Sequence, residues 1–224
     1  MNKQHLAVMA FESARAFAGE VAMRVRRDGQ WQPTTYREMG DSIRRIARAL
    51  LALGVQPGDR VGIMSENRPE WSLVDLGVLA VGGITVPIYA TNTRQQAAYI
   101  LDETEMSVIF TGSQAAYDKI QAIAAGPTTL RYMITLDDDT TIDGQASYHF
   151  GQFLALGTDA ADAEIETRLA AAESSDLATI IYTSGTTGEP KGVMLTHANL
   201  LHQFKALEGE FHVGPQDRSL CVLP

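Results

Sequence analysis

Short apolar segments rich in β-branched residues alternate with longer amphipathic segments along the middle of this chain, and this alternation constrains the fold most. Strands are predicted at 60–64, 84–88, 107–111 and 132–136, and helices at 71–81, 93–101 and 114–124. Strands that alternate with helices form a parallel sheet covered by helices on both faces. We therefore expect an α/β fold with a layered, doubly wound, mostly parallel sheet and flanking helices.

The segment 36–53 is the clearest helix. Its apolar residues recur at spacings of three and four, which places them on one face. Thr35 and Glu38 match a capping box at its start, and Gly54 is a suitable stop. The opposite face carries three arginines and is expected to be solvated: Arg44, Arg45 and Arg48. Upstream, we predict a helix at 6–17, a strand at 21–26 and a hairpin turn at Asp28-Gly29.

A loop from Tyr182 to Gly192 gathers hydroxyl groups, glycines and one lysine directly after an apolar, strand-like stretch. Glycine permits backbone angles closed to other residues, so successive N–H groups can converge on one point. Hydroxyl groups add neutral donors, and an ammonium group adds positive charge. These features predict a polyphosphate site, although the same small residues are common in ordinary surface turns. The candidate phosphate-binding residues are Thr183, Ser184, Gly185, Thr186, Thr187, Gly188 and Lys191.

This loop does not fit the phosphate-binding motif of kinases and ATPases, in which glycine precedes the lysine and a helix follows. Here Pro190 precedes Lys191, and the residues at 193–196 are typical of a strand. A kinase or ATPase is therefore disfavoured, and we expect the loop to join two strands. Glu189 is expected to point to solvent, because phosphate groups repel a carboxylate.

The composition narrows the class of protein. The formal net charge of −9 over 224 residues, with no block of lysine and arginine, argues against nucleic acid as a partner. Cys221 is the single cysteine and cannot form an internal disulfide, which fits a reducing compartment. It lies in an apolar run, so we expect it to be buried. The apolar stretch 76–88 is shorter than the roughly 20 residues that span a bilayer. We expect a cytoplasmic protein without a transmembrane segment; peripheral membrane contact stays open.

Other side chains that could carry chemistry have ordinary structural explanations. The five histidines make no metal-ligand spacing. The run Asp137–Asp139 is expected in a solvated loop, with a metal site as the alternative. His197 is expected to form local hydrogen bonds at the start of a helix, with a catalytic role as the alternative. Trp71 and Tyr89 are expected in the core, with a place in a substrate region as the alternative.

The stretch from Tyr182 to Leu200 resembles the phosphate-loop motif of the adenylate-forming (AMP-binding) superfamily. Three further segments are similar in order and spacing to long-chain fatty acid–CoA ligases: GVQPGD at 54–59, VGIMSENRPEW at 61–71 and GGITVPIYATNT at 82–93. The resemblance extends over essentially the whole chain. It implies the fold of the N-terminal domain of an adenylate-forming enzyme.

The resemblance also implies a two-step ligation that activates a long-chain fatty acid. The fatty acid and ATP give an acyl-adenylate and pyrophosphate, and the thiol of coenzyme A then displaces AMP. The residues 183–191 are assigned to the leaving pyrophosphate, and Thr183 is placed near Mg²⁺. The implied cofactors and co-substrates are therefore ATP, Mg²⁺ and coenzyme A.

Enzymes of this superfamily are considerably longer than this chain. Later family motifs, including the catalytic lysine of a C-terminal domain, are expected beyond residue 224. We therefore expect 1–224 to be a partial N-terminal AMP-binding domain with its phosphate loop at 182–192. It would lack a complete catalytic centre and be inactive alone. The alternative is a non-catalytic nucleotide-binding or oligomerising remnant, and a homo-oligomer stays open.

Overall fold

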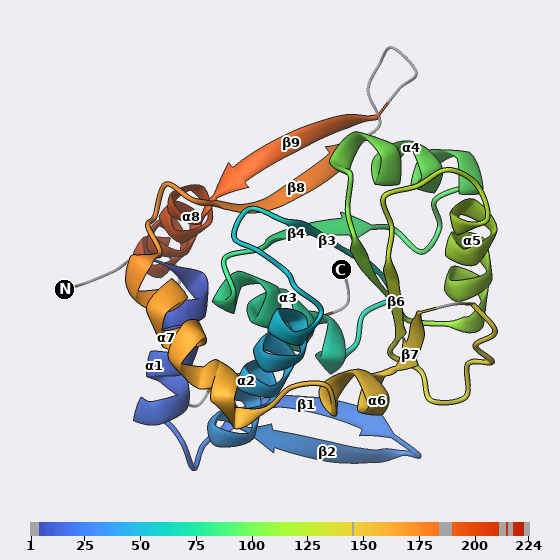
Figure 1. Ribbon diagram of the computed structural model, residues 1–224. Helices are drawn as coiled ribbons and strands as arrows, with labels where there is room; N and C mark the ends of the chain where they lie inside the picture. Colours follow the sequence, from blue (N-terminus) through green and yellow to red (C-terminus); the bar gives the residue numbers. More distant parts are fainter. Residues whose placement is uncertain (1–4, 145, 184–189, 211–213, 215–216, 222–224) are drawn as a thin grey trace.

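The computed structural model describes residues 5–144, 146–183, 190–210, 214 and 217–221, except the side chains of residues 208 and 209. A seven-stranded sheet lies at its centre, in the order β7-β6-β5-β3-β4-β8-β9 (Figure 1). The strands are β3 (Arg60–Met64), β4 (Ile84–Ile88), β5 (Val108–Thr111), β6 (Tyr132–Thr135), β7 (Ser147–His149), β8 (Leu177–Thr183) and β9 (Lys191–Thr196).

The sheet is mostly parallel, as predicted. Neighbouring strands from β7 through to β8 all pair in parallel, whereas β9 runs antiparallel to β8. β3 comes first in the sequence but lies near the middle of the sheet. The chain adds β4 on one side of it and β5 to β7 on the other, and then returns to place β8 beside β4. This change of direction is the mark of a doubly wound sheet.

Helices cover both faces of the sheet (Figure 1). One face carries α1 (Leu6–Ala16), α2 (Tyr36–Ala52), α3 (Pro69–Ala80), α6 (Phe150–Leu154) and α7 (Asp162–Ala171), with the short 3₁₀ helix η1 (Asp159–Ala161) before α7. The other face carries α4 (Arg94–Thr104) and α5 (Gln114–Ala124). The last helix, α8 (His197–Glu210), follows β9. Among the described residues, every helix is too short or too polar to cross a membrane.

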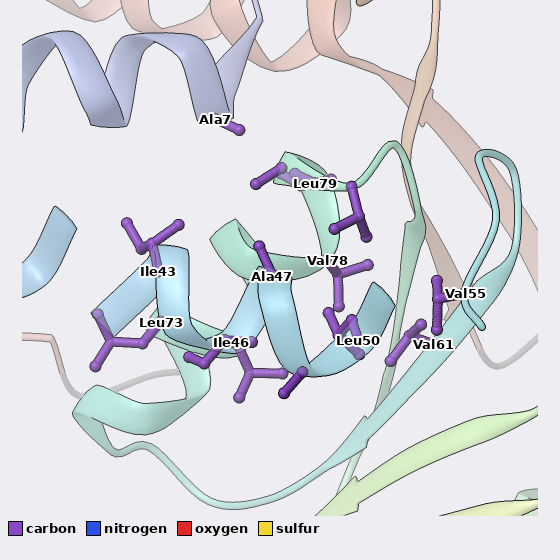
Figure 2. Packing of buried hydrophobic residues seen from close by; sticks show 14 of the residues in the cluster. Ala7, Ile43, Ile46, Ala47, Leu50, Val55, Val61, Leu73, Val78 and Leu79 are labelled. Carbon is purple, nitrogen blue, oxygen red and sulfur yellow. The ribbon is translucent and has the colours of Figure 1, made fainter. Parts of the chain in front are cut away.

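Alternate residues of the central strands enter two separate hydrophobic clusters. In β3, Val61 and Ile63 join the cluster beneath α2 and α3, whereas Met64 joins the cluster beneath α4 and α5. Figure 2 shows the first cluster, in which side chains of α2 and α3 pack together and against β3. Both faces of the parallel strands are therefore buried, which is why their sequences are continuously apolar rather than alternating.

The long helix α2 begins and packs as its sequence predicts. The Thr35 hydroxyl accepts a hydrogen bond from the Glu38 N–H at 3.3 Å, and the Glu38 carboxylate accepts one from the Thr35 N–H at 2.7 Å. Its apolar face lies against α3, where Gly77 allows a close approach. A Cβ atom at Gly77 would lie 2.4 Å from Cγ2 of Ile46, a fully buried side chain of α2. Glycine is therefore required where α2 and α3 cross.

The arginine face of α2 corrects one expectation. Arg45 is exposed, but Arg44 and Arg48 are covered by η1 and α7, so this face is not simply solvated. Arg48 forms ion pairs with Asp162, at 2.6 Å, and with Asp159. The sequence did not reveal this contact because the partners lie more than a hundred residues away.

The predicted hairpin forms a separate two-stranded sheet of β1 (Val21–Arg27) and β2 (Gln30–Thr35). Its turn residues Asp28 and Gly29 have positive φ angles of 49° and 78°, which suits an Asp-Gly hairpin. Arg27 joins this sheet to α3 through an ion pair with Glu70 at 2.7 Å.

Expectations for two loop positions have different outcomes. Cys221 is exposed, so the prediction that it is buried is wrong. Leu220 and Cys221 belong to none of the described strands, and the Cys221 sulfur lies 3.7 Å from the Asn67 amide nitrogen. Asp138 and Asp139 are exposed after β6, as expected, and the described residues hold no group of three acids, histidines or cysteines suited to a metal.

Replacing Gly77 with alanine should destabilise the fold, although alanine favours helix formation. The added methyl overlaps the Ile46 side chain, and overpacking of this kind costs about 1 to 3 kcal/mol. We expect a net loss of roughly 1 to 2 kcal/mol in urea unfolding after the helix-propensity gain of up to about 1 kcal/mol. The control is Gly151→Ala in α6, where the methyl meets nothing within 4 Å. Equal stability changes in the two variants would contradict the packing argument.

Candidate functional site

The predicted phosphate loop connects the antiparallel strands β8 and β9, as the sequence analysis expected. Thr183, the last residue of β8, lies directly opposite Lys191, the first residue of β9. Both residues are exposed at the end of this hairpin. A hydroxyl group and an ammonium group therefore flank the loop, one on each strand.

Five of the candidate residues lie outside the described residues: Ser184, Gly185, Thr186, Thr187 and Gly188. The same holds for Glu189, so its expected outward orientation stays a prediction. Of the seven candidates, Thr183 and Lys191 are described, and the strand pairing brings them together.

Aromatic packing anchors the base of the hairpin. Tyr182 is buried opposite Gly192, where a Cβ atom would lie 3.1 Å from the tyrosine ring. The same ring meets Tyr99 of α4 edge to face, with 6.4 Å between the ring centroids. Burial raises the pKa of Tyr182, so its hydroxyl stays protonated at neutral pH. The loop thus starts from a strand that is fixed to α4.

A cavity of about 720 Å³ lies beside this anchor. It is bounded by α4, by the segment 127–129 before β6 and by Pro190 at the end of the loop. Its described walls carry amides, hydroxyls and the carboxylate of Asp102, but no cationic side chain. Lys191 follows Pro190 at the start of β9, next to this cavity.

A second cavity, of about 480 Å³, lies between α3 and the strands β4 and β8. Trp71 and Tyr89 both line it. Tyr89 is 48% exposed, so the expectation that it belongs to the core is wrong, and the alternative of a place in a substrate region stays a prediction. Trp71 also packs against the core cluster. The other lining residues are Leu6, Ser65, Glu66, Asn67, Asp75, Leu79, Pro87, Ile88, Ala90, Thr91, Ala178, Thr179, Ile181 and Leu200.

This second cavity lies where the chain leaves the sheet in two directions. The segment after β3 leads to α3 on one face, and the segment after β4 leads to α4 on the other. Such a divergence of adjacent parallel strands opens a crevice at their carboxyl ends, where ligands of α/β proteins bind. Residues 65–67 and 89–91, from these two segments, line the cavity.

Asp75 is a titratable residue in this cavity to which no role was assigned from the sequence. It lies on α3, and burial raises the pKa of its carboxyl to about 6. The available signal was a single acid within an otherwise uncharged helical segment, WSLVDLGVLAV at 71–81. An ionised carboxylate in such a place costs stability unless a partner compensates it.

Replacing Asp75 with asparagine should stabilise the chain at neutral pH. The folded-state pKa of about 6 is above the ordinary value of 3.8, so ionisation of Asp75 opposes folding above pH 6. The gain for Asp75→Asn should reach up to about 3 kcal/mol there and shrink as the pH falls from 6 to below 4. Thermal unfolding of both proteins between pH 4 and pH 8 tests this. A constant difference across that range would contradict it.

Two buried histidines join the start of α1 to the start of α8. The rings of His5 and His197 lie with their centroids 3.6 Å apart, and both residues are almost fully buried. The ring atom Nδ1 of His197 accepts a hydrogen bond from the Leu6 N–H at 3.3 Å, and the backbone N–H of His197 donates to the Asp176 carbonyl at 3.1 Å. His197 therefore forms hydrogen bonds, as expected, but its side chain bonds to a residue 191 positions away rather than locally.

Acid should destabilise the fold through His197. Burial, followed by the neighbouring His5, lowers the pKa of His197 to about 4, against an ordinary value of 6.5. The unfolded chain therefore takes up a proton first as the pH falls from 6.5 to 4, and stability is lost over that interval by up to about 3 kcal/mol. In His197→Gln, unfolding measured over this range should show a weaker pH dependence, with His202→Gln on the exposed side of α8 as control. An unchanged profile in His197→Gln would refute the assignment.

Comparison with known proteins shows that residues 10–224 match the family described as AMP-binding enzyme. The chain belongs to this family. The resemblance identified in the sequence is thereby confirmed, and the sheet with its flanking helices is the N-terminal fold of adenylate-forming enzymes.

The chain is similar to several curated long-chain-fatty-acid–CoA ligases. It is 38% identical over 201 residues to FadD15 of Mycobacterium bovis and 37% identical to FadD15 of Mycobacterium tuberculosis; each match covers 90% of this chain and 32% of the relative. It is 31% identical over 222 residues to ACSBG2 of Rattus norvegicus, covering 95% of this chain and 33% of the relative. The chain thus spans about a third of the length of the curated relatives it matches.

Solved structures share the fold at low sequence identity. The acetoacetyl-CoA synthetase of Streptomyces lividans matches with a TM-score of 0.76 and 22% identity, over 92% of this chain and 32% of that one. A red-emitting luciferase of Phrixothrix hirtus matches with a TM-score of 0.72 and 18% identity, over 90% and 37%. At such identities the likeness shows the fold alone, since one fold supports many functions.

Proposed function

We propose that this chain is part of an ATP-dependent ligase that converts a long-chain fatty acid to its acyl-CoA, and that it supplies the loop that holds the phosphates of ATP. Its similarity to long-chain-fatty-acid–CoA ligases supports the substrate class. The observation that carries the role of the loop is the pairing of Thr183 with Lys191 at the end of the β8–β9 hairpin.

The chemical difficulty of the first step is charge. A fatty acid carboxylate attacks the α-phosphorus of ATP, so an anion approaches a polyanion, and further negative charge develops on the departing pyrophosphate. Donors held in place around the β- and γ-phosphates stabilise this developing charge without reorganisation. Lys191 supplies a cation, and the Thr183 hydroxyl supplies a neutral donor. Because antiparallel pairing and the Tyr182–Tyr99 contact fix both strands, these groups are positioned before the nucleotide arrives.

Mg²⁺ fits this arrangement as a companion of the nucleotide. The described residues hold no cluster of acids that would bind the ion without a substrate. Mg²⁺ in phosphoryl-transfer sites is commonly held by substrate phosphates, with few ligands from the protein. Thr183, exposed at the edge of the loop, is the residue we assign as such a ligand. Bound there, the ion would neutralise phosphate charge; coenzyme A enters as the second substrate.

Replacing Lys191 with alanine should weaken binding of Mg–ATP to this chain by about tenfold or more, because a charge-assisted contact to phosphate is lost. Isothermal titration calorimetry measures this directly. The matched control is Lys205→Ala, since Lys205 is exposed on α8, away from the hairpin end. Equal affinities of the Lys191→Ala variant and the unmodified chain would remove the basis for the proposed function.

The expectation that this chain is inactive alone has its own test. With palmitate, Mg–ATP and coenzyme A, the purified chain should bind nucleotide but form no acyl-adenylate and no acyl-CoA. Mass spectrometry of the products checks this. Detection of either product would show that the described fold already holds a complete catalytic centre.

The alternative, a non-catalytic module that oligomerises, is favoured by exposed apolar side chains near the end of the sheet. Val193 and Met194 of the edge strand β9 are 44% and 64% exposed, and Phe204 and Leu207 of α8 are about half exposed. Exposed apolar surface often marks an interface. A cytoplasmic location and contact with a membrane surface stay predictions.

A further inference from the structure

The cavity beneath α3 has no part in the proposed function, yet it has the properties of a ligand site. Its volume of about 480 Å³ is within the range of small-molecule pockets. It opens between the segments that follow β3 and β4, at the position where doubly wound sheets bind ligands. The loop that we assign to ATP is on the β8–β9 hairpin instead, so a ligand here would be a second one.

The walls of this cavity suit an apolar ligand. Apolar residues of three elements line it: Leu79 of α3, Pro87 of β4 and Ile181 of β8. Two aromatic side chains, Trp71 and Tyr89, complete the lining near the ends of the strands. Aromatic faces attract apolar groups, and they also attract cations through their quadrupoles.

The charge of the cavity is negative. Asp75 and Glu66 both line it, and its described lining includes no lysine, arginine or histidine. Within the part of the chain that the structure describes, no ion pair engages either carboxylate. The nearby Arg68 instead binds Glu70 and the carbonyl groups of Gly112 and Leu136. A bound anion would therefore be repelled, and a bound cation would be attracted.

We propose that this cavity binds an organic cation with an apolar body, such as an alkylammonium ion, with its charge at Asp75 and its hydrocarbon part against α3, β4 and β8. Fatty acids and nucleotides are anionic and do not fit this charge. The carboxylate of Asp75 lines a cavity in which its ionisation opposes folding, and a group that costs stability in a cavity is a candidate for binding.

Three eight-carbon probes that differ only in the head group test the proposal: octylammonium, octanol and octanoate. Trp71 is the reporter, because it lines the cavity, and a Trp31→Phe background removes the exposed tryptophan of β2. Quenching of tryptophan fluorescence then gives the affinity of each probe. We expect octylammonium to bind about tenfold more tightly than octanoate, with octanol between them.

Two variants test whether the carboxylate of Asp75 causes the preference for octylammonium. Asp75→Asn should weaken octylammonium binding about tenfold and leave octanol binding within about twofold, which also reports that the cavity is intact. Asp102→Asn is the matched control, since Asp102 lines the other cavity and should leave all three affinities unchanged. Octanoate binding as tightly as octylammonium, octanol binding as tightly as octylammonium, or no binding of any probe would each overturn the proposal. ATP is absent throughout, so these outcomes are independent of the test on Lys191.

Discussion

The fold depends on the burial of both faces of its parallel sheet. Strands that pair in parallel need a long connection between them, and here helices α3, α4 and α5 make the connections from β3 to β6 and pack on the sheet, whereas no described helix joins β6 to β7. Because β3 lies near the middle, helices must accumulate on both faces, and on the more crowded face α2 and α3 touch at Gly77 with no space for a Cβ atom. This packing determines where the strands end, and so where loops that carry chemistry can lie.

The two cavities follow from the same arrangement. β8 is the last parallel strand, and its side chains alternate between the two faces of the sheet: Tyr182 meets α4, whereas Ile181 lines the cavity beneath α3. The antiparallel return of β9 places Lys191 beside Thr183, the pair that we propose for the phosphates of ATP. The cavity beneath α3 contains Asp75 and Glu66, where we propose that an organic cation binds.

Polar contacts between residues far apart in the sequence join the outer helices to this core. Arg168 of α7 donates hydrogen bonds to the carbonyl groups of Val55 and Val81, which lie shortly after the ends of α2 and α3. His197 ties α8 to α1 through the Leu6 N–H. Buried donors and acceptors that lose their partners cost about 1 to 3 kcal/mol each, so these contacts fix the helices more strictly than apolar packing alone.

The amino-acid sequence by itself determined the order of strands and helices up to β6, the capping box of α2, the Asp-Gly hairpin and the strand-to-strand nature of the phosphate loop, whereas β7 and α6 were not predicted. Each of these is encoded by neighbouring residues, through periodicity, local hydrogen bonds or backbone angles. Tertiary structure alone decided that Arg48 meets Asp162, that Tyr89 lines a cavity, that Cys221 is exposed and that Asp75 faces a cavity with Glu66. These features depend on which distant segments pack together, and local patterns carry no information about that choice.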